Sequence, residues 1–239
     1  MTKSLANALA GDCRAAEVDR PDRTADVAGL RAAQQRIKRV ADVAGALCLL
    51  ILTAPVMILA AILVRLTSGG PVLYAQTRVG AGGREFSLLK LRTMIAGAER
   101  RTGPVMAIRG DPRITRIGRL LRAVRMDELP QLFNVLAGDM SLIGPRPERP
   151  HFVRIFRRQV PGYELRLAVR PGITGLAQIC GRYSTGPDVK LRFDLVYIRN
   201  YSLALDIEIF LRTILTVLKP SCAEGHRQAA AWLPGNGGD

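Results

Sequence analysis

VAGALCLLILTAPVMILAAILV, at residues 43–64, is an apolar run that no charged side chain interrupts. As an α-helix that rises about 1.5 Å per residue, it would reach roughly 33 Å, enough to cross the apolar core of a bilayer. From hydropathy alone, a single-pass membrane helix is favoured over the buried helix of a soluble protein.

Two features of this stretch argue against simple crossing. Basic residues within 36–39 precede it and Arg65 follows it, which favours a cytoplasmic location for both ends. Pro55 lies at its middle, where proline kinks or breaks a helix. A helix over residues 36–66 that is broken at Pro55, and enters and leaves by the same face, satisfies both features. Prolines also kink spanning helices, so the residues alone leave both topologies open.

The composition restricts what the chain binds. The chain has 239 residues and a formal net charge of +15, which requires an anionic partner such as nucleic acid, anionic lipid or a phosphorylated substrate. Only 5% of the residues are aromatic, which is few for a protein that stacks nucleic-acid bases. We therefore expect a lipid bilayer and a phosphorylated substrate as partners, and no nucleic acid. The four cysteines lack metal or redox spacing, which favours a reducing, cytoplasmic environment.

The chain divides into four segments. Residues 1–35 have no sustained apolar period and are expected to form a flexible tail rather than a signal peptide. Residues 36–66 hold the membrane helix, and residues 67–220 form a single globular catalytic domain of the α+β class that is mainly helical. Residues 221–239 are expected to form a second flexible tail.

Two short alternating stretches predict a β-hairpin. VLYAQTRVG at 72–80 and REFSLLKLRTM at 84–94 flank a glycine-rich turn. The hairpin places Lys90 and Arg92 at the end of its second strand or on the start of the following helix.

Two further stretches predict amphipathic helices. In RITRIGRLLRAVR, residues 113–125, arginine recurs at every third position and apolar residues at every third or fourth. Most charged faces are simply solvated, but the acidic pair that follows and the apolar run upstream favour a face toward phosphate or lipid. LALDIEIFLRTILTVL, residues 203–218, is too short and too charged to span a bilayer, so we expect a core or interfacial helix.

Asp127 and Glu128 open another predicted helix, DELPQLFNVLAG at 127–138. Asp127 suits its N-cap, Pro130 is tolerated in its first turn and Gly138 suits its stop. Both carboxylates would then stand at a helix N-terminus, where backbone donors and the helix dipole also favour phosphate. An Asp-Glu pair alone is a weak signal, because such pairs cap many helices.

The neighbourhood of this pair strengthens an enzymatic interpretation. Arg122 and Arg125 precede it within two turns, and Arg146 follows on GPRPERP, residues 144–150, which three prolines make stiff. Arginine forms bidentate bonds with phosphate. A carboxylate can attack a phosphoryl group, and Mg²⁺ held by carboxylates and substrate phosphates would neutralise the charge. No zinc-ligand spacing and no P-loop occur, which disfavours a zinc enzyme and an ATPase.

An ordered series of stretches resembles the small monotopic phosphoglycosyl transferases, the bacterial sugar transferase family that starts exopolysaccharide, O-antigen and glycoprotein glycan assembly. So long a series, over about residues 36–219, is far more specific than any single motif. The matching stretches are KRVADVAGALCLLILTAPVMILAAIL at 38–63, FSLLKLRTM at 86–94, DPRITRIGRLLRAVRMDELPQLFNVLAGDMSLIGPRPERP at 111–150, YELRLAVRPGITGLAQICGRY at 163–183 and DLVYIRNYSLALDIEI at 194–209.

The resemblance implies a mechanism and its residues. Asp127 corresponds to the nucleophile that takes a hexose phosphate from a UDP-sugar and releases UMP, with Mg²⁺ bound at the same residue. A polyprenyl phosphate such as undecaprenyl phosphate then attacks the aspartyl phospho-sugar, and a polyprenyl-diphosphate-sugar forms. Glu128 assists as a base or positions the aspartate. Four basic residues match family positions assigned here to the substrate phosphates, namely Lys90, Arg92, Arg122 and Arg146.

The resemblance also implies a topology. The family's membrane helix is re-entrant, so it enters and leaves the bilayer by the same face. It is broken at a residue-Pro pair that corresponds to Ala54-Pro55. The family often has Ser before this proline, so with Ala54 the break is expected to rest on proline alone. The catalytic domain would lie on the cytoplasmic face of the bacterial inner membrane. Many larger relatives carry four transmembrane helices and a further domain before this unit. Nothing here resembles that extension, so we expect the minimal catalytic form.

Other functions stay open at this stage. A non-catalytic membrane-surface adaptor, or a membrane-tethered nucleic-acid binder, would also account for the basic charge. The transferred sugar is left open, because hydroxyl recognition depends on the shape of the pocket. The oligomeric state is open as well, a homodimer included.

Overall fold

The computed structural model describes residues 32–98, 103, 110–180 and 186–218. This part of the chain is mostly helical with two small two-stranded sheets, which confirms the expected α+β class. Both predicted tails lie outside the described residues, except that residues 32–35 already belong to the first helix. With η for a 3-10 helix, the elements are α2 (Ala32–Ser68), β1 (Leu73–Val79), η1 (Ala81–Gly83), β2 (Glu85–Leu91), α3 (Arg116–Ala123), η2 (Met126–Glu128), α4 (Gln131–Ala137), β3 (Ser141–Ile143), α5 (Pro150–Gln159), η3 (Tyr163–Ala168), β4 (Gly172–Thr174), α6 (Leu176–Cys180), α7 (Pro187–Arg199) and α8 (Leu203–Leu218).

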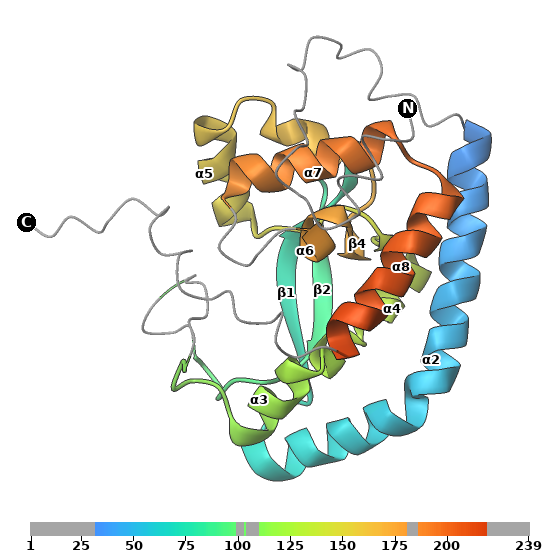
Figure 1. The fold of residues 1–239 in the computed structure, drawn as a ribbon. Helices are drawn as coiled ribbons and strands as arrows, with labels where there is room; N and C mark the ends of the chain where they lie inside the picture. Colours follow the sequence, from blue (N-terminus) through green and yellow to red (C-terminus); the bar gives the residue numbers. More distant parts are fainter. Residues whose placement is uncertain (1–31, 99–102, 104–109, 181–185, 219–239) are drawn as a thin grey trace, which may run out of the picture.

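Helix α2 contains the apolar run and bends part-way along its length (Figure 1). Helical structure continues through Pro55, so the predicted break is a bend within one helix rather than an interruption. Proline lacks the N–H that would bond to the Ile51 carbonyl. The Thr53 hydroxyl in the same region donates to the Leu49 carbonyl at 2.7 Å. The same contact recurs at Thr67 and Ser68 near the end of α2. That the bend rests on Pro55 alone therefore stays a prediction.

Both arms of the bent helix pack against the rest of the domain. Before the bend, Ala46 is buried in an apolar cluster with Leu132 of α4. After the bend, Ala60 and Val64 are buried in a second cluster with Leu121 of α3. One folded unit therefore holds both arms of α2.

The apolar surface of α2 between these contacts is largely left uncovered by the domain. Ile51 and Leu52, close to Pro55, keep 69% and 73% of their surface exposed. By length and composition, α2 is also sufficient to cross a membrane. An uncovered apolar surface of this kind is typical of a membrane or protein contact.

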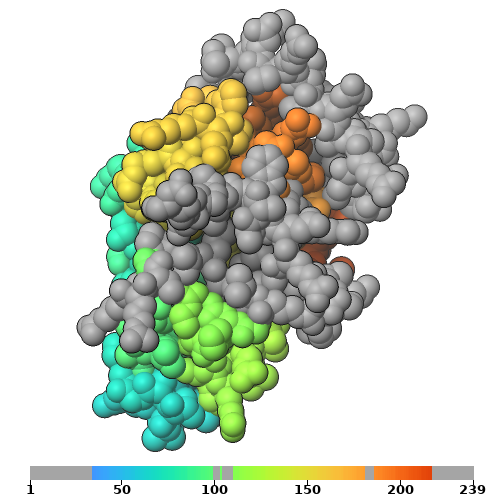
Figure 2. All heavy atoms as spheres, turned by 90° about the vertical axis from the view of Figure 1, so that its left-hand side faces the viewer, coloured from blue at the N-terminus to red at the C-terminus, as the bar shows by residue number. Residues whose placement is uncertain are grey.

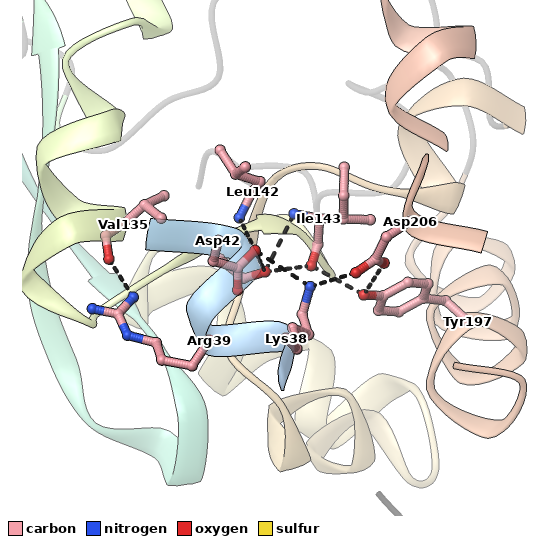
Figure 3. Close-up of polar contacts among 9 residues, drawn as sticks. Lys38, Arg39, Asp42, Val135, Leu142, Ile143, Tyr197 and Asp206 are labelled. Carbon is pink, nitrogen blue, oxygen red and sulfur yellow. Dashed lines mark hydrogen bonds and ion pairs between the residues drawn. The ribbon is translucent and has the colours of Figure 1, made fainter. Parts of the chain in front are cut away.

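Polar contacts fasten the first arm of α2 to the domain (Figure 3). The Lys38 ammonium lies 2.8 Å from Asp206 of α8 and 3.5 Å from Asp42, one helical turn further along α2. Asp42 in turn accepts hydrogen bonds from the Ser141 hydroxyl and the Leu142 N–H of β3. The start of α2 is thus tied to two separate parts of the domain.

Arg39, next to this cluster, caps the C-terminal end of α4. Its guanidinium donates to the Val135 carbonyl at 2.6 Å (Figure 3). It also donates to the Leu136 carbonyl at 2.9 Å. Carbonyls in the last turn of a helix lack a helical partner, so these bonds satisfy them. Gly138 ends α4 with a φ of 95°, in the stop position that the sequence predicted.

Strands β1 and β2 form the predicted antiparallel hairpin, which lies at the centre of the molecule (Figure 1). Tyr74 pairs with Lys90, and Arg92 directly follows β2, so both basic residues lie where the pattern placed them. The Val79 N–H donates to the Glu148 carbonyl at 2.9 Å. This bond joins the hairpin to the proline-rich segment.

The largest apolar core joins α5, η3, α7 and α8. Phe152, Phe156 and Tyr163 are in ring contact within it. Strands β3 and β4 pair in parallel beside this core. At Gly172 a Cβ would lie only 2.1 Å from the Gly144 nitrogen, so this close approach of two backbone segments requires glycine.

Helix α3 is shorter than the stretch 113–125 that predicted it. Thr115 caps it by accepting a hydrogen bond from the Gly118 N–H at 2.9 Å. Leu121 is buried, whereas Leu120 keeps 58% of its surface exposed, so apolar side chains occupy both its inner and its outer side. Figure 2 shows the green residues around α3 next to the cyan later part of α2, and the yellow residues around α5 at the far end of this face.

Candidate active site

A sharp turn between α3 and α4 presents Asp127 and Glu128. Arg125 has a φ of 58°, a left-handed conformation that is uncommon for a residue with a side chain. The turn leads into η2, and α4 begins only after Pro130, which occupies the N-cap position. The predicted N-cap role of Asp127 is therefore wrong, because both carboxylates precede the α-helix.

Three cations surround the Glu128 carboxylate. Arg146 Nη2 donates to its Oε1 at 2.6 Å, and Lys90 Nζ donates to the same oxygen at 3.1 Å. Arg125 Nη1 lies 3.8 Å from its Oε2. Burial alone would raise the pKa of Glu128, but the charges of Arg146 and Lys90 outweigh it and hold the pKa well below its usual value. Glu128 is therefore ionised at neutral pH and fixed in place.

Asp127 is buried beside Glu128 but is bonded to none of these cations. Its exposed fraction is 7%, and within the described part of the chain no hydrogen bond or ion pair reaches its carboxylate. Burial, and then the charge of Glu128, raises the pKa of Asp127, although Lys90, Arg122 and Arg146 oppose the shift. The dyad thus places a fixed, stabilised carboxylate beside a free one that burial destabilises.

Different elements position the basic residues around the dyad. Lys90 lies on β2, and Asn134 of α4 bonds to the β2 backbone through both ends of its amide, at 3.0 and 2.8 Å. Arg122 of α3 donates through Nε to the Thr93 hydroxyl at 2.8 Å. Five of the predicted site residues therefore lie close enough for their charges to act on the dyad or belong to it, namely Lys90, Arg122, Asp127, Glu128 and Arg146.

Arg92, which was also predicted at the phosphates, has different contacts. Its side chain is buried, and Nη2 donates to the Ser68 carbonyl at 3.0 Å and to the Ser68 hydroxyl at 2.7 Å. The fit is close, since a Cβ at Gly70 would lie 2.1 Å from Arg92 Nη1. These contacts fasten the end of α2 to the hairpin, so a phosphate role for Arg92 stays a prediction.

Two contributors to the site lie outside the predicted set of site residues. Arg125 was expected near the acidic pair but inside a helix, and its left-handed conformation has no signal because glycine or asparagine usually marks such positions. Thr93, which holds Arg122, directly follows the Lys90-to-Arg92 signature and could have been proposed from that position.

A metal ion would find few protein ligands here. Over the residues that the structure describes, no group of three or more His, Cys, Asp or Glu side chains could hold one. Glu128 is engaged by cations, whereas no residue that the structure describes forms a hydrogen bond with the Asp127 oxygens. Mg²⁺ often binds through one or two carboxylates together with substrate phosphates and water. The donor set therefore fits a Mg²⁺ ion shared with a phosphorylated substrate and not one held by a protein cage.

Comparison with known proteins places this site in a family. Residues 33–220 match the family model described as bacterial sugar transferase. This chain belongs to the bacterial sugar transferase family. It is 47% identical over 185 residues to a UDP-N-acetylgalactosamine-undecaprenyl-phosphate N-acetylgalactosaminephosphotransferase of Aeromonas hydrophila, a match that covers 76% of this chain and 44% of that protein.

Two further relatives carry a different name. A UDP-glucose:undecaprenyl-phosphate glucose-1-phosphate transferase of Caulobacter vibrioides (strain ATCC 19089 / CIP 103742 / CB 15) is 47% identical over 188 residues, which cover 76% of this chain and 69% of that protein. A protein of the same name from Escherichia coli (strain K12) is 41% identical over 183 residues, which cover 74% of this chain and 39% of that protein. This bacterial sugar transferase therefore spans less than half the length of the Aeromonas and Escherichia relatives.

Two conclusions follow for this bacterial sugar transferase. Helix α2 lies almost entirely within the matched residues, so the exposed apolar helix is part of the family unit and indicates association with a membrane. The Aeromonas and Caulobacter relatives are equally identical to the chain, yet their names give different sugars. Overall identity therefore does not select the sugar.

Proposed function

We propose that this bacterial sugar transferase moves a hexose 1-phosphate from a UDP-sugar to undecaprenyl phosphate on the cytoplasmic face of the inner membrane. The reaction would be the first membrane step of exopolysaccharide or related glycan synthesis. The observation that carries the proposal is the buried Asp127 carboxylate, which no described residue bonds, beside a Glu128 that cations hold in place. The donor and acceptor follow the names of the relatives.

The proposed chemistry has two displacements at one phosphorus. An Asp127 oxygen attacks the β-phosphorus of the UDP-sugar, and the bond from this phosphorus to the bridging oxygen breaks. UMP leaves with that oxygen, and the sugar phosphate stays on Asp127. An oxygen of undecaprenyl phosphate then attacks the same phosphorus and displaces the Asp127 carboxylate, which yields undecaprenyl-diphosphate-sugar.

The surroundings of the dyad support separate roles for its two members. Asp127 has no partner among the described residues to release before it attacks, and its raised pKa reflects an anion that burial stabilises poorly. Lys90 and Arg146 bring positive charge to the position where phosphate oxygens would lie. Glu128 is a poor proton acceptor at neutral pH because its pKa is lowered, so we assign it the role of holding these two cations.

Mg²⁺ would be held by Asp127 together with the phosphates of the donor. When bound there, it supplies charge neutralisation for the diphosphate.

The position of α2 supports a re-entrant topology. Both arms of the helix pack on one domain, and its two ends are fastened by the Lys38–Asp206 and Arg92–Ser68 contacts. A helix that crossed the bilayer would carry its ends to opposite faces, about 30 Å apart, where one domain could not hold both. The bend at α2 therefore favours entry and exit by the same face.

The function is tested by UMP release from a panel of UDP-hexoses with undecaprenyl phosphate and Mg²⁺. We expect turnover with at least one sugar, and a loss of at least about a thousandfold for Asp127→Asn, because the amide cannot form the covalent intermediate. Rapid quenching without acceptor should trap a sugar phosphate on Asp127 of the wild-type chain.

A matched control is Asp139→Asn, which changes an exposed aspartate just beyond α4. The new amide oxygen can still accept the 3.5 Å hydrogen bond from the Asn134 amide, so turnover should stay unchanged. Normal turnover by Asp127→Asn would show that the proposed mechanism is wrong. Absence of turnover with every UDP-sugar, together with salt-sensitive binding to anionic liposomes, would favour a membrane-surface adaptor instead.

A further inference from the structure

Arg166 is a buried cation outside the group around the dyad. It lies on η3, and its side chain is 5% exposed. Its Nη1 donates to the Tyr163 hydroxyl at 2.6 Å, and its guanidinium lies over the Tyr163 ring at 5.1 Å. Its Nη2 forms an ion pair of 2.8 Å with Asp194 of α7, whose side chain is 2% exposed. Arg166 is thus held by Tyr163 of its own element and by Asp194 of α7.

The same Nη2 atom of Arg166 also donates to the backbone carbonyl of Arg146, at 2.9 Å. Arg146 lies between two prolines, which have no N–H with which to anchor the segment. Donors from elsewhere in the fold hold the segment through its carbonyls instead. The Gly172 N–H donates to Pro145 O at 2.9 Å, Arg166 donates to Arg146 O, and Arg78 Nη1 donates to Pro147 O at 3.0 Å.

The side chain of Arg146 points the other way, toward the dyad, where it donates to Glu128 at 2.6 Å. A continuous series of contacts therefore runs from Asp194 through Arg166 to the Arg146 backbone, and from the Arg146 guanidinium to Glu128. No described contact joins Arg166 to Asp127 or Glu128 directly. Among the contacts of the described residues, the route from Arg166 to the dyad passes through Arg146.

We propose that Arg166, anchored by Asp194, is a positioning residue that sets where the Arg146 guanidinium meets Glu128 and the substrate phosphates. The inference rests on the proposed function, because it assigns Arg166 a role in that reaction. A purely structural alternative is that the Arg166–Asp194 pair only holds η3 and α7 together. The two readings differ in whether the effect of Arg166 on catalysis depends on Arg146.

A double-mutant cycle on the full chain in detergent or vesicles distinguishes them. kcat/KM for UMP release is measured for the wild type, Arg166→Lys, Arg146→Gln and the double variant, with each rate normalised to folded protein. Lysine at 166 keeps the charge beside Asp194 but not the rigid fork that bonds several partners at once. We expect Arg166→Lys to lower kcat/KM about tenfold when Arg146 is present, and by less than about twofold in the Arg146→Gln background. The shift in Tm should be the same in both backgrounds.

Asp206→Asn is the matched control. Asp206 is also a buried aspartate paired with a cation, and it also lies next to a tyrosine hydroxyl, that of Tyr197 at 2.8 Å. Any effect of Asp206→Asn on kcat/KM should be equal in both Arg146 backgrounds. If Arg166→Lys does not fold, Asp194→Asn takes its place in the cycle, because it removes the anchor of Arg166 and leaves its bond to Arg146.

The outcomes separate the inference from the function on which it rests. Dependence of the Arg166 effect on Arg146, without such dependence for Asp206→Asn, supports the positioning role. An equal loss in both Arg146 backgrounds, or no loss at all in an active enzyme, overturns it and leaves the proposed function standing. A folded wild type that releases no UMP from any UDP-sugar overturns both.

Discussion

At the residue scale, Asp127 and Glu128 adjoin in the chain but have opposite surroundings, so their amide variants should differ in stability. Asp127→Asn removes a buried charge that no described residue pairs, and we expect the free energy of unfolding to stay the same or to rise by up to about 1 kcal/mol. Glu128→Gln leaves Lys90 and Arg146 without their counter-charge and should cost about 2–4 kcal/mol. Thermal unfolding in detergent without Mg²⁺ measures both. Equal destabilisation by the two changes would contradict the asymmetry.

Because the pKa of Glu128 is lowered in the folded chain, the loss of stability in Glu128→Gln should depend on pH. Because its pKa in the folded chain lies well below the ordinary 4.5, Glu128 contributes stability that is complete above its unfolded pKa. That contribution is lost as the pH falls through the lower, folded pKa. The stability difference between the wild type and Glu128→Gln should therefore persist from about pH 7 to pH 5 and shrink toward about pH 3. A difference that stays constant over this range would show that the charge of Glu128 is not its cause.

The sequence predicted most of the residues near the dyad, but not which partner each of their side chains would bond. Lys90 and Arg92 are two apart on an extended chain, a spacing that places both on one face. In the structure Lys90 bonds to Glu128, whereas Arg92 bonds to Ser68 at the end of α2. Two long side chains on one face can reach different partners, and which partner lies within reach depends on tertiary packing that local spacing does not contain.

At the element scale, the bend of α2 depends on Pro55 and is tested by Pro55→Ala. Alanine restores an N–H for the Ile51 carbonyl and favours a straight helix. A straight α2 cannot keep both of its packed arms on one domain, so we expect lower thermal stability and accessibility of the N-terminal segment from the periplasm. Labelling of Cys13 in intact cells by a membrane-impermeant thiol reagent measures the topology, with none expected for the wild type.

Ala54→Ser is the matched control for this prediction. It restores the serine that the family often has before the proline, keeps Pro55 and should leave Cys13 protected. Periplasmic labelling of Cys13 in the wild type would favour a spanning helix and contradict the re-entrant topology. The Thr53 hydroxyl bond to Leu49 should persist in Ala54→Ser, so any change of topology there would have to come from the new hydroxyl alone.

Helix α4, next to the dyad, shows why the first residue of a helix was harder to predict than the presence of the helix. The pattern of residues 127–138 correctly indicated a helix that ends at Gly138. Its start was placed too early, because Asp127 is a good N-cap and Pro130 is tolerated in a first turn. The chain instead inserts η2 after the left-handed Arg125, and cations around Glu128 hold this turn. Tertiary contacts to the carboxylate thus outweighed the local capping preference.

At the scale of the whole molecule, exposed apolar surface is concentrated on particular helices. On α8, Ile207 and Leu211 are 61% and 54% exposed, whereas Leu205 and Ile209 are buried in the core. Lys38 joins the start of α8 to the first arm of α2, so two apolar helices are tied together. Periodicity predicted that α8 is amphipathic, but it left open whether the helix belongs to the core or to an interface. The structure shows that each of its two sides is apolar and that the domain covers one of them.

Helix α5 exposes basic side chains where α2 and α8 expose apolar ones, and it lies on the side away from α2 (Figure 1). Its exposed side chains include Arg154 and Arg158. If α2 and the outer side of α8 meet the bilayer, Leu211 should contact lipid, whereas Arg158 should remain in water. An environment-sensitive dye on Leu211→Cys, in a chain whose native cysteines are replaced by serine, should shift to the blue on vesicles of bacterial lipid. The same dye on Arg158→Cys should show no such shift.

Because Leu211 is half exposed, the Leu211→Cys substitution should change the free energy of unfolding by less than about 0.5 kcal/mol, so a shift cannot be ascribed to unfolding. Equal responses at the two positions would mean that α8 does not face the membrane and that α2 alone anchors the enzyme.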